Sequence, residues 1–274
     1  ALSKAQARAL ATAQIRALST NQIAALEIAD FGAMATTQLQ AFSTGQIRVL
    51  SLEHMATLNT AQVASFSADQ IKALRVEQVG AWSETQVASL TAAQVKLLST
   101  AQLQMVDASE VRSLSTVQVA ALSTLQLSAL SNDQLSGLQT SHIRALNVAQ
   151  FVALGTSQLA SMTADQLDAV TIQQLAALST AQVRSLNNDQ IYSLSDVQLK
   201  AFTAAQVKSL TGDQLLSLSS RIDTFSVTQI GGLSTSQIRA LAGDQIAALL
   251  TSQVRSLSAA QLKALTPEIG RAHV

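Results

Sequence analysis

The sequence repeats with a period of eight residues, and this period restricts the possible folds more than any other feature. From Leu2 to Ala264 the chain divides into 33 units of the form Leu-Ser-x-x-Gln-Val-x-Ala, whose positions are numbered one to eight. Position one is always apolar, and position five is Gln in 28 units. A repeat this short cannot bury a core alone, so each unit is expected to pack on its neighbours.

Neither one long helix nor a strand explains a period of eight. Eight residues advance an α-helix about 80° beyond two turns, so the apolar stripe would circle the helix and leave no single face to bury. In a strand the apolar residues alternate, whereas positions one, six and eight do not. The helix is therefore expected to break in every unit.

Position two supplies the break. It is Ser or Thr in 21 units and Asn or Asp in four more, and these residues are preferred at helix N-caps. Gln three residues later completes a capping box, because its side chain can accept from the N–H of the cap residue. Thirteen of the 17 Lys and Arg stand at position seven, where a cation favours a helix C-terminus. The pattern predicts one helix of about two turns per unit.

These observations predict an all-α solenoid of very short capped helices over residues 1–264, with a one-residue register slip at residues 218–224. Residues 265–274 are expected to form a C-terminal cap or tail. Most basic residues at position seven fall one or two units beyond a multiple of four, which favours four helices per coil and leaves three open. The Gln column is expected to be partly buried, since a neutral amide avoids the repulsion of stacked carboxylates and has spare donors for a neighbouring unit.

Several departures from the consensus are expected to serve packing. Aromatic residues replace Leu at position one and are predicted to be core residues: Phe42, Phe66, Trp82, Phe202 and Phe225. Larger apolar residues replace the small residue at position eight and are expected to mark a local change in curvature or an apolar patch: Val49, Leu97 and Met105.

The Gln column is broken in five units, and these are the candidate site residues: Asp30, His54, Glu110, His142 and Arg221. The preferred interpretation is that another polar group makes a similar bond. Asp30 and His54 are three units apart, and Glu110 and His142 are four, so either pair could stack between coils. Two residues make a poor metal site, because most sites need three or more ligands. No catalytic set and no phosphate loop is visible, so neither an enzyme nor a cofactor is expected.

The charge composition disfavours two classes of partner. Seventeen basic residues balance 17 acidic ones, and the chain has no Cys. Without a run of like charge, neither nucleic acid nor an anionic membrane is an electrostatically favoured partner. Ser, Thr or Gln interrupts every long apolar window, so no transmembrane segment is expected.

Segments such as "LSTAQVRSL", "LTAAQVKLL" and "LSTSQIRAL" resemble Leu-[Ser/Thr]-x-x-Gln-aliphatic-x-Ala arrays in large secreted or surface proteins of Gram-negative bacteria. Such proteins are loosely described as haem-utilisation or adhesin-like. The resemblance implies an extracellular or cell-surface location. "LTPEIG" at Leu265 also looks like the start of a TAL-effector repeat, but that repeat is longer and carries a base-reading loop, so DNA binding is not expected.

The leading functional hypothesis is a structural spacer, stalk or scaffold. The alternative is a binding module for itself, a peptide or a glycan, which would gain support if the larger residues at positions three, four and seven gathered on one face. Ice binding is a weaker alternative, based on Thr at position three: Thr20, Thr44, Thr60, Thr116 and Thr180. The first coil lacks a polar cap, so end-to-end association through Leu10 and Ile15, or continuation into a larger parent chain, is expected; lateral association between copies is the other form of self-association considered. A true end is expected at residues 265–274.

Overall fold

The structure is a computed structural model that describes residues 3–265. Over this range the chain forms 32 α-helices and one 3-10 helix, and it contains no strand. The chain packs as two units, Ala1–Leu146 and Asn147–Val274. The prediction of one continuous array over residues 1–264 stays a prediction. The predicted cap at residues 265–274 lies, apart from Leu265, outside the described residues.

The first unit contains eighteen helices: α1 (Lys4–Ala9), α2 (Thr12–Ala17), α3 (Thr20–Ala24), α4 (Ile28–Phe31), α5 (Thr36–Gln40), α6 (Thr44–Val49), α7 (Leu52–Thr57), α8 (Thr60–Ala64), α9 (Ala68–Ala73), α10 (Val76–Val79), α11 (Glu84–Ala88), α12 (Ala92–Leu97), α13 (Thr100–Leu103), α14 (Ala108–Ser113), α15 (Thr116–Ala120), α16 (Thr124–Ser128), α17 (Asn132–Gly137) and α18 (Thr140–Ala145).

The second unit contains fourteen helices and the 3-10 helix: α19 (Val148–Val152), α20 (Thr156–Ser161), α21 (Ala164–Asp168), α22 (Ile172–Ala177), α23 (Thr180–Ser185), α24 (Asn188–Ser193), α25 (Asp196–Ala201), α26 (Ala204–Ser209), α27 (Gly212–Ser217), η1 (Ser219–Thr224), α28 (Val227–Gly231), α29 (Thr235–Ala240), α30 (Gly243–Ala248), α31 (Thr251–Arg255) and α32 (Ala259–Ala264).

Each helix corresponds to one octad and has four to six residues, which is shorter than the two turns predicted. The helix ends early because the next Leu takes an extended backbone conformation instead of continuing it. Leu130 and Ser131 show the junction between two octads: Leu130 at position one is buried, and Ser131 at position two caps the next helix, α17. The predicted repeat of capped helices is confirmed.

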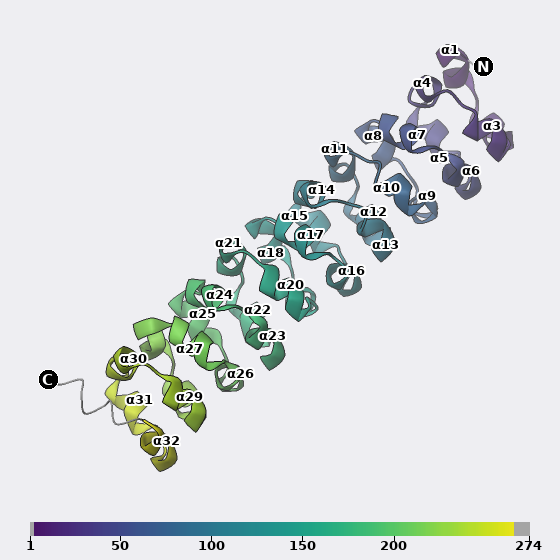
Figure 1. The fold of residues 1–274 in the computed structure, drawn as a ribbon. Helices are drawn as coiled ribbons and strands as arrows, with labels where there is room; N and C mark the ends of the chain where they lie inside the picture. Colours follow the sequence, from purple (N-terminus) through teal and green to yellow (C-terminus); the bar gives the residue numbers. More distant parts are fainter. Residues whose placement is uncertain (1–2, 266–274) are drawn as a thin grey trace. The chain divides into compact units, whose positions relative to one another are not determined.

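Three helices form each coil, so the preference for four drawn from the charges is wrong. In both units the main contacts join a helix to the third helix along the chain, as α11, α14 and α17 do (Figure 1). Each octad therefore lies beside the octad three before it, and octads related in this way form one row. The charge pattern misled because position seven faces solvent, where its charge is not constrained by the number of helices per coil. The rows are named here by their first member: the α1, α2 and α3 rows in the first unit and the α19, α20 and α21 rows in the second.

The register slip at residues 218–224 appears as η1. Ser219 has φ 49, and among residues 3–265 it is the one residue with a positive φ, a conformation that is uncommon for a residue other than Gly. The third-neighbour contacts continue through the slip, since α25 contacts η1 and η1 contacts α30. The shortened octad therefore replaces an α-helix with a 3-10 helix, which rises further per residue, and keeps its place in the coil.

Apolar residues at positions one and six form the core, as Leu127 and Leu130 do with 0% and 4% of their surface exposed. The five aromatic residues at position one are also buried, as predicted, and Phe66 stacks on Trp82 with ring centroids 6.4 Å apart. The first coil differs from the expectation of an exposed apolar end. Ile15 is fully buried, because position six is covered by the coil that follows it, whereas the position-six residues Val254 and Leu262 near the other end are 39% and 45% exposed; Leu10 is half-buried.

Small residues at position eight allow each helix to approach the third helix before it. A Cβ on Gly137 would lie 2.5 Å from the backbone oxygen of Ala108, a distance that real Cβ atoms do not reach. Where position eight is larger, the facing position seven can be Gly. Met105 faces Gly80, on which a Cβ would lie 3.2 Å from the Met105 side chain. The larger residue is therefore accommodated by a smaller partner in the preceding coil.

Candidate functional site

The Gln column is the most extensive polar feature of the interior. Gln126 accepts a hydrogen bond at Oε1 from the N–H of Ser123 (2.8 Å), while Ser123 Oγ accepts from the N–H of Gln126 (3.2 Å). The same side chain donates from Nε2 to the carbonyl oxygens of Val95 (3.0 Å) and Leu98 (2.8 Å). Gln126 is 3% exposed. It therefore joins the start of its own helix to the end of a helix one coil earlier.

This arrangement recurs along each unit and explains why the column is Gln. Gln70 and Gln206 likewise donate to carbonyls 31 and 28 residues earlier. The last carbonyls of an α-helix have no partner within it, and here the Gln one coil later supplies one. The amide accepts from the cap N–H and donates to these carbonyls without carrying a charge, whereas a carboxylate accepts but cannot donate.

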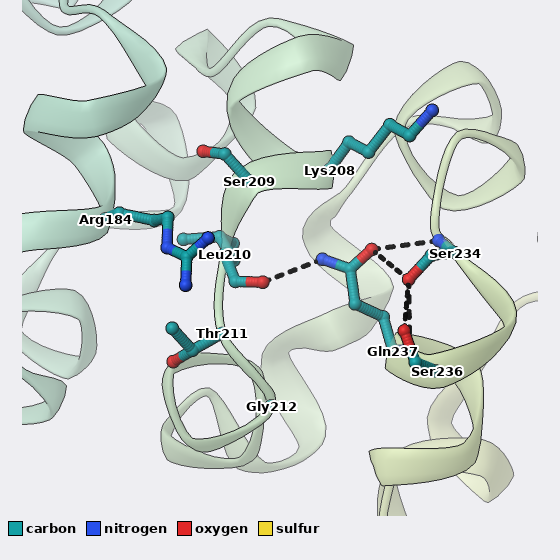
Figure 2. A pocket seen from close by; sticks show the side chains of 9 residues that line it. All are labelled: Arg184, Lys208, Ser209, Leu210, Thr211, Gly212, Ser234, Ser236 and Gln237. Carbon is teal, nitrogen blue, oxygen red and sulfur yellow. Dashed lines mark hydrogen bonds between the residues drawn. The ribbon is translucent and has the colours of Figure 1, made fainter.

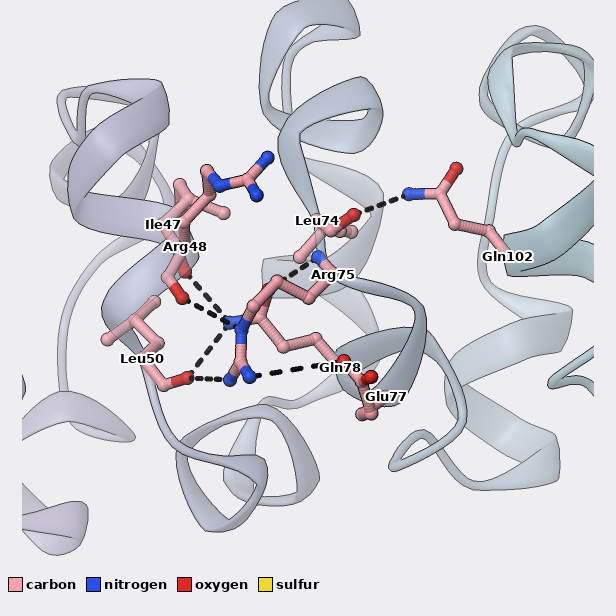
Figure 3. A network of polar contacts seen from close by, with 8 residues as sticks. All are labelled: Ile47, Arg48, Leu50, Leu74, Arg75, Glu77, Gln78 and Gln102. Carbon is pink, nitrogen blue, oxygen red and sulfur yellow. Dashed lines mark hydrogen bonds and ion pairs between the residues drawn. The ribbon is translucent and has the colours of Figure 1, made fainter.

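The cation at position two can reinforce the same junction. Arg75 caps no helix with its side chain but donates from Nε to the Arg48 carbonyl (2.9 Å) and from Nη2 to the Leu50 carbonyl (3.2 Å). Gln78 donates to Leu50 as well (2.9 Å), so both side chains cover one helix end (Figure 3). Glu77 lies 3.9 Å from the guanidinium. The Arg75 and Gln78 side chains therefore stabilise a coil junction.

His54 and His142 occupy the column and keep the bond at the cap and one of the two bonds to the preceding coil. His54 Nδ1 lies 3.2 Å from the N–H of Ser51, and its Nε2 lies 3.0 Å from the Leu26 carbonyl, 28 residues earlier. These partners require a neutral ring with its proton on Nε2. Burial lowers the pKa of His54 below its usual value, against the raising effects of the Leu26 carbonyl and Glu53. Both histidines are 2% exposed.

His142 shows the same geometry. Its Nδ1 lies 3.0 Å from the N–H of Gln139, and burial lowers the pKa of its ring, against the raising effect of a hydrogen bond to the Leu114 carbonyl. Leu114 stands in the same place relative to His142 as Leu26 does relative to His54. An imidazole with both nitrogens engaged in this way is not free to bind a metal ion or to act as a base.

Glu110 keeps only half of the pattern. Its Oε2 accepts from the N–H of Asp107 (2.8 Å), but a carboxylate has no proton for the carbonyls of Val79 and Trp82 at the helix end one coil earlier. Burial raises the pKa of Glu110 above its usual value, and the negative charge of Asp107 adds to the effect. The indole Nε1 of Trp82 is the one buried side-chain donor within residues 3–265 that has no hydrogen-bond partner.

Arg221 and Asp30 complete the five departures. Arg221 lies in η1 and donates to the carbonyls of Tyr192 (2.8 Å) and Leu194, and it pairs with Asp196 at 2.8 Å. Leu194 stands at position one, 27 residues before Arg221. Gln229 and Gln237, which follow the one-residue slip, also donate to the position-one carbonyl 27 residues earlier. Asp30 is 4% exposed, and the residue that would offer it a carbonyl one coil earlier, Leu2, lies outside the described residues.

The five candidates do not converge on one site. Three helices per coil place Asp30 and His54 on neighbouring helices of the α1 row, α4 and α7. Glu110 is in the α2 row and His142 in the α3 row, so the stacking considered for this second pair does not occur. Among residues 3–265 no group of three or more His, Asp and Glu is placed to hold a metal ion.

The exposed surface was expected to discriminate between the scaffold and binding hypotheses. In the first unit, the large exposed apolar residues at positions three, four and seven lie on two rows, with Leu52 and Leu125 in the α1 row and Val117 in the α3 row. In the second unit they are divided among all three rows. The larger residues do not gather on one face, so the criterion for the binding hypothesis is not met by these residues.

Threonine at position three also fails to form one array. Thr20, Thr44 and Thr116 stand in the α3 row, whereas Thr60 stands in the α2 row. Alanine at position three interrupts the α3 row between Thr44 and Thr116, at the starts of α9 and α12. An ordered ice-binding face needs a regular series, so the distribution gives no support to ice binding.

Comparison with known proteins supports the repeat and little else. The model of the ALTTAQ repeat family matches residues 23–60, and its name spells the octad from position eight to position five. No curated protein shows significant similarity to the chain. Within the described residues, no helix is long and apolar enough to cross a bilayer. The chain is a tandem-repeat protein in which residues 23–60 are similar to the ALTTAQ repeat.

Proposed function

We propose that the chain is a structural repeat segment, a spacer or scaffold without catalytic activity, in a secreted or cell-surface bacterial protein. The observation that supports it is that the buried side chains at position five bind the backbone of the preceding coil. Gln126, His54 and Arg221 all use their donors to bond the backbone of the preceding coil. Polar groups that other proteins place in active sites are here consumed in holding one coil to the next.

The proposal also rests on the energetics of the repeat. A helix of four to six residues is not stable alone in water, because nucleation is costly and few bonds repay it. Each octad therefore depends on the octads three before and three after it. A coil added to such an array supplies the same set of contacts as the coil it follows, so length can change without a change in local structure. A spacer needs this property.

The test is to insert whole coils within the first unit. Duplicating residues 58–81 once or twice adds one or two coils in register, since Leu58 can follow Ala81 as position one follows position eight. We expect the maximum dimension from small-angle X-ray scattering to grow by the same increment each time, with constant helicity per residue. Duplicating residues 74–81 alone should add about one third of that increment, because three helices form a coil.

A matched control carries a Gly-Ser insertion of the same length at the same site, which should lower stability and add no helix. The proposal fails if the coil insertions leave the maximum dimension unchanged, or if one octad lengthens the particle as much as three. The surface location is tested separately, by fractionating cells that express the natural parent protein. Its recovery in the cytoplasm alone would exclude the location.

A further inference from the structure

Two neighbouring helices of the α20 row, α23 and α26, each carry a cation that takes part in no ion pair with a described residue. Arg184 and Lys208 stand at position seven of α23 and α26, which pack against each other. Both side chains are exposed. The two ion pairs formed among residues 3–265 are Arg75–Glu77 and Arg221–Asp196, so neither of these cations takes part in one. Among the helices α19–α27, neither the α19 row nor the α21 row has two successive members with a basic residue at position seven.

A surface cavity of about 360 Å³ lies between these cations and the starts of two later helices, α27 and α29. Its lining is polar and contains no acidic side chain; it includes Arg184, Lys208, Thr211, Ser234, Ser236 and Gln237. Figure 2 shows the Arg184 guanidinium beside Leu210 and Thr211, while the Lys208 side chain extends from the next helix away from them. The cavity is large enough for a small oxyanion with its water.

The neutral groups of the lining are held in place by the repeat. Gln237 donates to the Leu210 carbonyl (2.9 Å) and accepts from Ser234 Oγ (3.0 Å), and Ser234 Oγ lies 2.9 Å from Ser236 Oγ. Thr211 Oγ1 accepts from the N–H of Gln214 (3.1 Å). No described residue accepts the Thr211 hydroxyl proton, so it remains available for a ligand.

We infer that this cavity binds a tetrahedral oxyanion, a sulfate or phosphate group, between Arg184, Lys208 and the Thr211 hydroxyl. A guanidinium presents paired N–H donors that match two oxygens of such a group, and Lys supplies a second, mobile charge. The absence of an acid in the lining leaves the positive potential uncompensated. The group could be free phosphate or sulfate, or part of a larger molecule such as a sulfated glycan. This inference does not depend on the proposed function.

The experiment is calorimetric titration of the chain with sodium sulfate and, separately, sodium phosphate at pH 7, with chloride adjusted to equal ionic strength. Specific binding should saturate at one site, and Arg184→Gln should weaken it by about tenfold, as expected for loss of a charge-assisted bidentate contact. Lys208→Gln should weaken it less, and Arg184→Lys should recover part of the loss. Both side chains are exposed, so circular dichroism should show the variants folded.

The matched control is Arg239→Gln, because Arg239 is also a cation at position seven but does not line the cavity. It should bind both anions as the unchanged chain does. A sulfated disaccharide and a phosphorylated peptide form two further arms, and the one that binds more tightly than its inorganic anion identifies the source. The inference is overturned if neither inorganic anion saturates a site, or if Arg184→Gln binds as tightly as Arg239→Gln.

Discussion

Replacing Gln126 by Leu tests the coil-to-coil bond directly. The substitution introduces an apolar side chain of similar size and removes three hydrogen bonds with backbone groups, one from the N–H of Ser123 and two to the carbonyls of Val95 and Leu98. It also removes one from the Ser123 hydroxyl, which belongs to an exposed residue and can turn to water. At about 1 kcal/mol of net stabilisation for each of the three bonds with the backbone, the loss is about 3 kcal/mol. The Val95 carbonyl still accepts from the N–H of Leu98 (3.3 Å), whereas the buried Leu98 carbonyl loses its donor and therefore carries most of the cost.

Gln22 provides a matched control in the same column. It follows a Ser cap, lies in the five-residue helix α3 as Gln126 lies in the five-residue helix α16, and accepts from the N–H of Ser19 at 2.8 Å. Its side chain is exposed, and its Nε2 donates to no described residue. Water can replace its single bond, so Gln22→Leu should cost less than about 1 kcal/mol.

The measurement is urea denaturation of both variants, with amide hydrogen exchange around Ser123 to detect local opening, since repeat proteins need not unfold in one step. A third variant, Gln126→His, should lose only about 1 kcal/mol at pH 8, because His54 keeps one bond at each ring nitrogen in the same environment. Equal costs for Gln126→Leu and Gln22→Leu would refute the reasoning, since they would show that the Nε2 bonds contribute nothing.

Three further outcomes are expected. Gly137→Ala should destabilise the protein by about 2 kcal/mol in urea melts, because the new Cβ would lie 2.5 Å from a backbone oxygen. Gly243→Ala, which has open space around it, should instead stabilise by up to about 1 kcal/mol. Equal effects of the two changes would count against the close approach at Gly137. Burial lowers the pKa of His54 and His142, so their contribution to stability is complete above about pH 6.5 and is lost as the pH falls through their folded pKa. Replacing both by Gln should therefore make the urea midpoint less dependent on pH between pH 7.5 and 5. Burial raises the pKa of Glu110, so its contribution is complete below about pH 4.5 and is lost as the pH rises through the folded pKa; Glu110→Gln should therefore stabilise by about 1 to 3 kcal/mol more at pH 7.5 than at pH 4.5, and a gain independent of pH would contradict the assignment.

The sequence predicted what each octad does by itself and failed where the answer depended on other octads. Ser123 and Gln126 are three residues apart, so a local rule identified their capping box before the fold was known. The carbonyls of Val95 and Leu98 are 31 and 28 residues away, and no local rule gives the number of helices in a coil. The basic residues could not supply that number. Arg184, for example, is exposed, and its position depends on solvent and ligands instead of on packing.

The burial of Ile15 was missed for the same reason. Position six was expected to be exposed at the N-terminal end, without knowledge of which neighbouring coil covers it. The structure shows that the following coil does: Ala7, Ile15 and Ile23 of the first coil have 0% exposure, whereas Val254 and Leu262 in α31 and α32 are 39% and 45% exposed. A test of self-association by charging Ile15 would therefore unfold the first coil. Leu10 is only half-buried, so Leu10→Lys is the variant that can report on contacts between copies.

The five departures from Gln can be ordered by what each side chain is able to donate and accept. A neutral His does both, and His54 and His142 lie in α-helices, α7 and α18, whose N-cap residues each offer an N–H to the ring. Arg only donates, and Arg221 lies in η1, which has no side-chain cap and whose N-cap N–H, that of Leu218, already donates to the Leu215 carbonyl. The register slip and the arginine thus belong together, because the shortened octad removed the need for an acceptor.

Glu110 is the departure that this ordering marks as unfavourable, since it accepts at the cap but cannot donate to the coil before it unless it is protonated. Its neighbours accord with a weakened junction: Asp107 caps α14 with a second carboxylate, and burial raises the pKa of Glu110 towards the neutral form that can donate. A column of Glu would repeat this conflict in every octad. The near-invariance of Gln therefore follows from a requirement placed on one side chain by two helices, each too short to satisfy its own ends.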